Sequence, residues 1–523
     1  MRIPKSVKYA LQKLEENGFD AYIVGGCVRD LLLKRRPKDW DITTSAKPEQ
    51  IQKIFPDSFY QNKFGTVTAR IKERKNIREI QITTYRKETK YTDKRHPDKV
   101  KWAKTLKEDL KRRDFTINAM AMGMVQSTKR PLRRSEARPV ELGGPLRRSE
   151  ARPVELGGKA QGHNLKLKAN KFRIIDLFNG QQDLKDKLIR AVGNPKDRFS
   201  EDALRMMRAV RFAVELNFDI EKNTFNAIEK NAYWIQAISK ERIRDELTKI
   251  IMSDKPDKGI ELLRKTGLLT YIIPELENGV GVSQNRHHIY TIYTHLILSL
   301  KYAALRKYNL AVRLAALFHD IAKPQTKKGE WPDATFYNHD VLGAKFAIKI
   351  LQRLKFPKKL IEKVAILVRN HMFVYDIEKV SEAGVRRLIR RVGMENIPDL
   401  IKLRICDRLG SGCPKAVPYK LRHLQYVIER VSKDPISVKM LNINGNDIMD
   451  ALKISPGPRI GLLLNALLSE VLENPKRNKK EYLIKRAKEL NKLSDKQLKE
   501  LTQKVKEKKE EVDMELKQKY WVK

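Results

Sequence analysis

Apolar and polar positions follow two different periods along this chain. In the first hundred residues helical patterns alternate with strand patterns: the apolar run Ala21–Val24 is followed by Gly25-Gly26, then by a short helix and another strand candidate. From about residue 184 onward apolar residues recur at helical spacing almost everywhere, and strand signals are few. The pattern predicts an α/β head followed by an α-helical body.

One segment interrupts this order. PLRRSEARPVELGG occupies residues 131–144 and is repeated without change at 145–158. It is rich in Arg, Pro and Gly, and it carries too few apolar residues to offset its own ordering entropy. We therefore predict that 127–168 is a disordered insertion in a hairpin. An additional RNA-binding arm is the alternative, because Arg-rich segments can fold on RNA.

The composition changes again beyond residue 475, where Lys, Glu and Leu dominate. This composition is typical of a charged helical tail. We interpret the tail as a solvated helix in preference to a dedicated RNA clamp.

Length, charge and cysteine content indicate the number of domains, the kind of partner and the compartment. A chain of 523 residues is too long for one core and should divide into three or four domains. Its 109 Lys and Arg residues exceed its 64 Asp and Glu residues, and the net charge of +45 attracts polyanions. No run of about 18 apolar residues could cross a bilayer, and the opening residues indicate an amphipathic helix instead of a cleavable signal. Three scattered cysteines suit neither a disulfide framework nor a zinc site, so we expect a cytoplasmic protein.

The tetrapeptide DWDI contains the first candidate for chemistry. On a strand the side chains alternate between faces, so Asp39 and Asp41 would point the same way. Paired carboxylates of this kind hold Mg²⁺, and a two-metal site can activate an attacking hydroxyl while it neutralises a triphosphate. Upstream, Gly25 and Gly26 would let the backbone approach phosphate oxygens, and Arg29 on the following helix would add positive charge.

These residues resemble a known family. GGCVRDLLL at 25–33, DWDITT at 39–44 and KRRDFTINAMAM at 111–122 are similar to the head of the class II tRNA nucleotidyltransferases and bacterial poly(A) polymerases. The resemblance implies a head with a small mixed sheet and helices. It also implies that Arg113 binds the triphosphate and that Asp114 accepts hydrogen bonds from the ribose hydroxyls.

EDALRMMRAVRFA at 201–213 extends the resemblance. A single helix over this segment would place Asp202, Arg205 and Arg208 on one face. In the family this helix is a protein template, whose carboxylate accepts from the exocyclic amine of C or A while the Arg donates to the ring nitrogen. Arg208 and Arg211 would then face phosphate or stack, although an intrahelical ladder of salt bridges is the alternative.

Smaller features bear on which polymer is made. The family often carries a third carboxylate where this chain has Gln81, and Glu79, two residues earlier, would share its face. The segment at 84–102 resembles the family's full-length flexible loop, with Asp93 and Arg95 in its acidic–basic motif. The resemblance thus implies a CCA-adding enzyme that transfers C and A from CTP and ATP to the 3′ end of tRNA. An A-adding enzyme, a poly(A) polymerase or an inactive RNA-binding relative are the alternatives.

Six of the nine histidines fall between His287 and His371. His287 and His288 receive no role, but others resemble the metal-binding pattern of HD-domain phosphohydrolases: His295, His319, Asp320 and Asp407, with His339 and His371 as completion of a second metal position. Imidazole and carboxylate ligands from separate helices would hold a divalent transition metal or Mg²⁺ and generate hydroxide for phosphoester hydrolysis.

The resemblance covers nearly the whole chain except 127–168 and the tail after about residue 480. We therefore expect five segments: a nucleotidyltransferase head at 1–190, a helical neck with the base template at 191–280, an HD domain at 281–410, a tRNA-binding helical body at 411–475, and the charged tail at 476–523.

Overall fold

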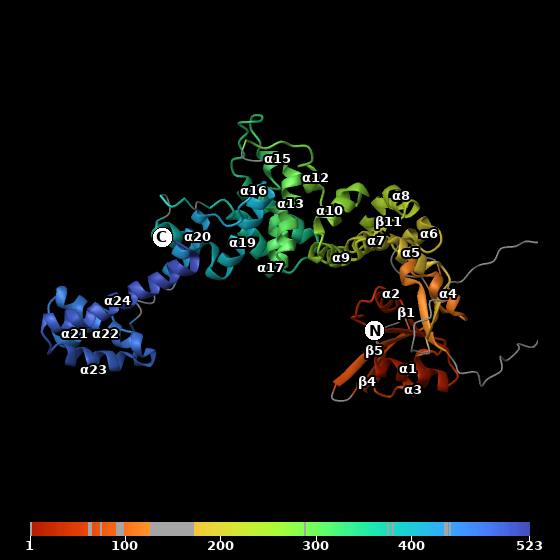
Figure 1. The fold of residues 1–523 in the computed structure, drawn as a ribbon, viewed down its shortest axis with the longest axis horizontal. Helices are drawn as coiled ribbons and strands as arrows, with labels where there is room; N and C mark the ends of the chain where they lie inside the picture. The colour runs from red at the N-terminus through yellow and green to blue at the C-terminus, as the bar shows by residue number, and fades with distance from the viewer. Residues whose placement is uncertain are drawn as a thin grey trace, which may run out of the picture. The chain divides into compact units, whose positions relative to one another are not determined.

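The structure is a computed structural model, drawn in Figure 1. It describes residues 3–60, 65–73, 76–89, 99–125, 172–286, 289–373, 376–378, 381–432, 438 and 441–522. The chain splits into two compact units, Met1–Ile238 and Ser239–Lys523. Each unit has its own core and is considered by itself.

The first unit is built on a seven-stranded mixed sheet with the order β3-β4-β5-β2-β1-β8-β9. β2 runs parallel to β5, whereas the other neighbouring strands are antiparallel. Ile23, Ile42 and Ile82 on the central strands are fully buried, as the apolar runs predict. The strands are β1 (Ala21–Val24), β2 (Asp41–Thr44), β3 (Ser58–Tyr60), β4 (Thr66–Glu73), β5 (Asn76–Thr84), β8 (Met120–Met124) and β9 (Phe172–Asp176).

Helices cover this sheet. In α1 the residues Val7, Leu11 and Leu14 form a buried stripe at helical spacing. α1 and α3 lie side by side against the sheet, and α2 packs on β1 and β8 (Figure 1). These helices are α1 (Lys5–Glu16), α2 (Gly26–Leu32), α3 (Pro48–Ile54) and α4 (Leu106–Lys111). A separate hairpin of β6 (Arg86–Thr89) and β7 (Lys99–Trp102) packs on α4.

The remainder of the first unit is mostly helical. It contains η1 (Thr116–Asn118), α5 (Gly180–Asp186), β10 (Leu188–Ile189), α6 (Pro195–Glu201), α7 (Leu204–Leu216), β11 (Asp219–Ile220), α8 (Lys222–Asn231) and η2 (Ala232–Ala237). α7 is buried along most of its length. The predicted fold class, a mixed-sheet head followed by a helical body, is confirmed.

The strands on either side of the repeated segment are hairpin partners. Met124 of β8 lies opposite Phe172 of β9 in an antiparallel pair. The insertion at 127–168 lies outside the described residues, as do Asp93 and Arg95. Predictions about their structure therefore stay predictions.

The second unit is helical. α13 packs against α14 and α19, and α16 packs against α17. No helix among the described residues is both long and apolar enough to span a membrane. From residue 240 to residue 410 the helices are α9 (Lys240–Met252), α10 (Pro256–Lys265), α11 (Leu268–Ile272), α12 (Pro274–Glu277), α13 (Ile292–Leu305), α14 (Leu310–Phe318), α15 (Lys323–Thr326), α16 (His339–Arg353), α17 (Lys358–Arg369), α18 (Glu382–Val392), η3 (Met394–Asn396) and α19 (Ile397–Gly410).

The C-terminal helices contradict the interpretation of the tail as a solvated helix. Leu498 and Leu516 of α24 are buried, and α24 packs on both α22 and α20. The Tyr426 hydroxyl of α20 donates to Asp513 of α24. The charged composition conceals this apolar contact surface, since its partners lie elsewhere in the sequence. These helices are α20 (Tyr419–Ser432), α21 (Gly445–Leu452), α22 (Pro458–Glu473), η5 (Pro475–Arg477), α23 (Lys480–Leu490) and α24 (Asp495–Tyr520).

Candidate functional site

Asp39 and Asp41 lie at the start of a central strand. Asp41 is the first residue of β2, and Asp39 lies in the bend just before it. The prediction that both lie on the strand is therefore wrong for Asp39. Trp40 and Ile42 are both buried, so the carboxylate of Asp41 between them is directed away from these two side chains, and Asp39 is exposed.

The electrostatics of Asp41 suit a bound cation. Burial raises the pKa of this carboxyl, and the neighbouring Asp39 raises it further, while Arg113 lowers it. A carboxylate such as Asp41, whose ionised form is disfavoured, is stabilised when a divalent cation binds beside it. Carboxylate oxygens are also the donors that Mg²⁺ prefers, so the residues present fit this metal.

No third carboxylate lies directly beside Asp41 on the neighbouring strand. Gln81 of β5 is the register partner of Asp41. Glu79 lies opposite Arg70 on β4, and its Oε1 is 3.5 Å from the Arg70 Nε. Both of these side chains are about half exposed, so Glu79 forms a surface ion pair.

Gly25 allows an arginine to approach the start of α2. Its φ of 79° lies in the left-handed region, and a Cβ at this position would be only 2.9 Å from Nη1 of Arg113. Arg113 lies 3.6 Å from the buried Asp109. The Gly-Gly turn thus brings the guanidinium of Arg113 close to Asp41.

Arg29 links α2 to the rest of the site. Its Nη1 donates to Oδ1 of Asn118 at 2.9 Å, and its Nη2 lies 2.8 Å from Oδ1 of Asp30. The same guanidinium lies 3.5 Å from the position of a Cβ on Gly26. Arg29 is therefore fixed at the amino end of α2, where helix amides also favour anions.

The ring of Phe212 on α7 is surrounded by three guanidinium groups. The Cζ atoms of Arg29, Arg208 and Arg211 lie 5.2, 5.4 and 4.2 Å from its centroid. Phe115 contacts the same ring edge-on at 5.8 Å. Cation–π attraction holds the three cations in place, although they repel one another. The sequence analysis missed Phe212, because an aromatic residue at helical spacing resembles ordinary core.

Asp114 is buried and held by Arg208. Its Oδ2 accepts from Nε and Nη2 of Arg208 at 2.8 and 2.6 Å, and its Oδ1 accepts from the Phe115 amide and from Asn118. Burial alone would raise the pKa of Asp114, but Arg208, Arg205 and the Asn118 amide lower it to about 2. Asp114 therefore stays ionised and positions Arg208.

The predicted template helix is broken at its first acidic pair. α6 ends at Glu201 and α7 begins at Leu204, so Asp202 lies between two helices. The Oδ1 of Asp202 accepts from the Leu204 amide at 3.1 Å. The prediction that Asp202 shares one helix face with Arg205 and Arg208 is wrong, because its carboxylate satisfies an amide of the new helix.

Arg205 is nearly buried and anchored at both ends of its guanidinium. Nη1 donates to the Arg198 carbonyl at 3.0 Å and to the Glu201 carboxylate, and Nη2 donates to the Arg112 carbonyl at 3.1 Å. Glu201 also forms an ion pair with Arg198. The structure thus brings the start of α7 together with the segment that carries Arg113 and Asp114.

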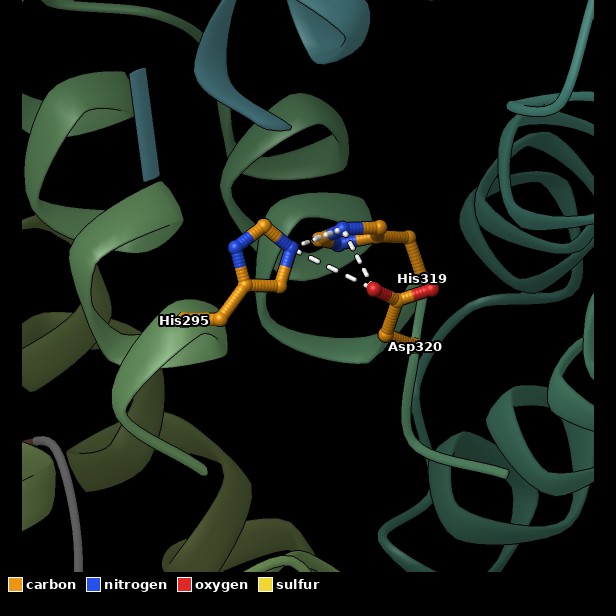
Figure 2. A group of neighbouring side chains, drawn as sticks. All are labelled: His295, His319 and Asp320. Atoms are coloured by element: carbon orange, nitrogen blue, oxygen red, sulfur yellow. Dashed lines mark hydrogen bonds and ion pairs between the residues drawn. The ribbon is translucent and has the colours of Figure 1, made fainter. Parts of the chain in front are cut away.

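The second unit contains a cluster of histidines and carboxylates, part of which is drawn in Figure 2. His295 of α13 and His319 at the end of α14 direct their Nε2 atoms at each other, 2.9 Å apart. The Oδ2 of Asp320 lies 3.3 and 3.5 Å from these two nitrogens (Figure 2). Asp407 of α19 approaches the same nitrogens at 3.4 and 3.6 Å.

Asp320 also faces a second pair of histidines. Its Oδ1 lies 3.4 Å from Nε2 of His339 and 3.4 Å from Nε2 of His371, and these nitrogens are 3.3 Å apart. In each of the two groups His295–His319–Asp320 and Asp320–His339–His371, one potential ligand atom from each residue lies within 4.8 Å of the others. The structure therefore brings together all six residues that the sequence singled out for the HD site.

The hydrogen bonds on the far side of the rings set the tautomers. The Nδ1 atoms of His319, His339 and His371 lie 3.0, 2.6 and 2.7 Å from backbone carbonyl oxygens, which can only accept. Nδ1 therefore carries the proton and Nε2 carries a lone pair in each neutral ring. Lone pairs directed at one another do not bond, whereas a divalent cation between them would satisfy them.

The two carboxylates of this cluster, from Asp320 and Asp407, also indicate a cation site. Oδ1 of Asp320 is buried without a hydrogen-bond partner among the described residues. Burial alone would raise the pKa of Asp320, but Lys323 and His319 hold it well below its usual range. The pKa of Asp407 is likewise low, because His319 and Arg404 outweigh its burial. The residues present therefore fit one or two divalent metal ions.

A pocket of about 620 Å³ opens onto the cluster. Three cationic residues line it, Lys323, Arg404 and Arg408, and Lys323 lies 2.7 Å from Oδ2 of Asp320. Tyr337 and Met372 at its wall are mostly exposed. Such a pocket can receive an anionic group beside the metal ligands.

The Asp41→Asn variant should separate stability from activity. Because the pKa of Asp41 is raised in the fold, its ionised form destabilises the metal-free protein at neutral pH, and the neutral amide should leave the melting temperature unchanged or slightly higher. Metal-dependent chemistry at the site should fall at least about a hundredfold. Thermal melts and turnover should be compared with Asp57→Asn, which alters an exposed carboxylate. Comparable turnover in the two variants would remove Asp41 from the site.

Metal binding tests the HD cluster, since the two oxygens of Asp320 serve both histidine pairs. Calorimetric titration with Mn²⁺, Co²⁺ or Ni²⁺ should give tight sites that His339→Ala reduces by one and Asp320→Ala abolishes. Asp41→Asn should retain them. Equal metal binding by Asp320→Ala and the unaltered protein would contradict this arrangement.

Comparison with known proteins gives matches along most of the chain. The family model described as Poly A polymerase head domain matches residues 21–130. The one described as Probable RNA and SrmB- binding site of polymerase A matches 217–279, and the HD domain model matches 292–411.

Proteins that are similar to this chain over most of their length are CCA-adding enzymes. The CCA-adding enzyme of Ligilactobacillus salivarius (strain UCC118) is 32% identical over 497 residues, which cover 93% of this chain and 98% of the relative. The CCA-adding enzyme of Lactococcus lactis subsp. lactis (strain IL1403) is 32% identical over 409 residues, which cover 76% of this chain and 90% of the relative. Among solved structures, the Bacillus stearothermophilus CCA-adding enzyme in complex with CTP matches with a TM-score of 0.56 and 25% identity, over 94% of this chain and 98% of that chain.

Proposed function

Since the chain belongs to the class II CCA-adding enzymes, in the form that carries an HD domain, we propose that it completes tRNA by adding C and A from CTP and ATP to the 3′ end. As a member of this family it is a nucleotidyltransferase. The observation that carries the proposal is the convergence of two carboxylates and four arginines in the first unit. We also propose that the chain is divided into the five segments expected from the sequence.

In this proposal Asp39 and Asp41 hold Mg²⁺, which would neutralise the triphosphate and lower the pKa of the attacking 3′-hydroxyl. The protein groups bind and orient the nucleotide. Guanidinium groups near Gly25 and around Phe212 receive the phosphates: Arg113, Arg29, Arg208 and Arg211. The buried Asp114 keeps Arg208 in place and is the acceptor assigned to the ribose.

We assign base selection to Asp202 and Arg205. A carboxylate that accepts from an exocyclic amine and a guanidinium that donates to a ring nitrogen together match C and A, whereas U and G present the opposite polarity. Glu201 positions Arg205 through their ion pair. Asp202 precedes α7, so its side chain need not point in the same direction as the helix face that carries Arg205 in order to reach the base.

The direct test uses tRNAs that end before CCA, after C and after CC, each offered one nucleotide at a time. The proposal predicts C, C and A addition in that order, with no U or G. Addition of A alone to tRNA ending in CC would identify an A-adding enzyme, and long A tails would identify a poly(A) polymerase.

Arg205→Ala should alter base choice more than transfer. Removing the donor to the ring nitrogen should cost on the order of 2 to 3 kcal/mol in discrimination, as for other charged hydrogen bonds. Misincorporation of U and G should therefore rise, and slow turnover should remain because Asp41 and Arg113 are untouched. Lys196→Ala, an exposed cation on α6, is the control. Retained selection of C and A by Arg205→Ala would place base recognition elsewhere.

We further propose that the HD cluster hydrolyses phosphoesters. The facing lone pairs of His339 and His371 and the cationic pocket support this activity. His319→Ala should eliminate hydrolysis of a phosphomonoester or a 2′,3′-cyclic phosphate and spare nucleotide addition, since the two sites belong to different units. Absence of hydrolysis in the unaltered protein with Mg²⁺, Mn²⁺, Co²⁺ and Ni²⁺ would mark the cluster as structural.

A further inference from the structure

α18 carries an unusual concentration of positive charge. Its sequence EAGVRRLIRRV buries Val385, Leu388 and Val392 and exposes all four of its arginines, which are Arg386, Arg387, Arg390 and Arg391. Residues three and four apart are neighbours on a helix, so the last three of these arginines form one continuous row.

The acidic groups near α18 do not neutralise this row. Glu382 is shared between Arg386 and Arg430 of α20. In the parts of the chain that the structure describes, Arg387 and Arg390 form no ion pair. An exposed row of uncompensated guanidinium groups favours a polyanion.

The row leads to the HD pocket. The Nε of Arg391 donates to Oδ1 of Asn370 at 2.6 Å, and Asn370 immediately precedes the metal-site residue His371. Met372, the next residue, lines the pocket. The arginine row therefore ends at the wall of the pocket that holds the metal ligands.

The lining of the pocket from α19 is also positively charged. Arg404, Asp407 and Arg408 lie on one face of α19 and line the pocket, so a metal-site carboxylate is flanked by two more arginines. At the mouth, Tyr337 is 73% exposed and presents an aromatic face to solvent. Stacking on such a ring is one of the ways in which proteins hold unpaired bases.

We propose that α18 is an RNA-binding surface that delivers the phosphorylated end of a polynucleotide to the HD pocket. This inference rests on the proposed hydrolytic activity, and it makes a polynucleotide rather than a free nucleotide the preferred substrate. A free nucleotide would fill the pocket but leave α18 empty. A membrane partner is disfavoured because the main apolar residues of α18, Val385, Leu388 and Val392, are buried in the protein.

A binding experiment without added metal tests the surface. The probe is a short single-stranded RNA with a 3′-phosphate, which cannot be extended, and fluorescence anisotropy is recorded over a range of salt concentrations. Arg387→Glu/Arg390→Glu should weaken binding at least about tenfold at low salt and reduce the slope of log affinity against log salt by about 1.4, or 0.7 for each lost phosphate contact.

The matched control is Lys358→Glu/Lys359→Glu. It makes the same change of charge in the same unit, at the end of α17 remote from His371, about 18 Å along the helix axis. The control should change binding less than about twofold, and both variants should keep the melting temperature of the unaltered protein. Equal binding by the two variants would show that α18 is merely a solvated face and would overturn the proposal.

Activity distinguishes this inference from the function on which it rests. The unaltered protein should hydrolyse a 2′,3′-cyclic phosphate at an RNA end with a lower KM than the corresponding cyclic mononucleotide. The α18 variant should lose this preference while keeping its rate on the mononucleotide and its KM for tRNA in nucleotide addition.

Two other results would overturn the inference. A rise in the KM for tRNA that matches the loss of RNA binding would assign α18 to the tRNA being extended. Hydrolysis of RNA ends and mononucleotides with equal KM would leave the HD activity standing without this surface. If the unaltered protein hydrolyses neither substrate, the hydrolytic proposal fails, and delivery to the pocket fails with it even where α18 binds RNA.

Discussion

The first unit depends on keeping several guanidinium groups close together before any anion is bound. Three of them, from Arg29, Arg208 and Arg211, lie around the single ring of Phe212, and the buried Asp114 fixes one of the three. Each cation–π contact contributes roughly 0.5–2 kcal/mol, which offsets part of the mutual repulsion. Each of the three guanidinium groups also has a carboxylate beside it, from Asp30, Asp114 and Glu215 respectively. In the proposed function, this preorganised group of cations would receive the triphosphate.

The histidine and carboxylate cluster of the second unit has the opposite electrostatic character, because it gathers electron-pair donors instead of cations. There the unsatisfied groups are lone pairs and carboxylate oxygens, and Asp320 presents one oxygen to each pair of histidines. Backbone carbonyls on the far side of the rings hold the protons away from the centre. In the proposed function this site would bind cations, while the arginines and Lys323 that line its pocket would bind the anionic group on which the metals act. The first unit therefore carries a site suited to anions and the second a site suited to cations, which is consistent with two separate activities on one chain.

Much of this arrangement follows from sequence. The sequence pattern placed Asp41 at a central strand between the buried Trp40 and Ile42, and the order of histidines and aspartates identified the whole HD cluster. The template helix was mispredicted because the apolar period continues through 201–213, whereas the side chain of Asp202 bonds the Leu204 amide and starts a new helix. Contacts that depend on distant segments, such as Arg391 with Asn370 or α24 with α20, leave no local signal.

The preorganised arginine cluster is tested most directly by calorimetric titration of CTP into the RNA-free protein. Phe212→Leu keeps an apolar residue on α7 but removes the ring that holds the three cations, and it should weaken CTP binding about tenfold. Phe199→Leu, at a fully buried position on α6, makes the same substitution and should bind CTP as the unaltered protein does. Both variants should lose similar stability, on the order of 1–2 kcal/mol. Equal CTP affinity in the two variants would contradict the account, because the arginines would then not depend on Phe212 to receive the triphosphate.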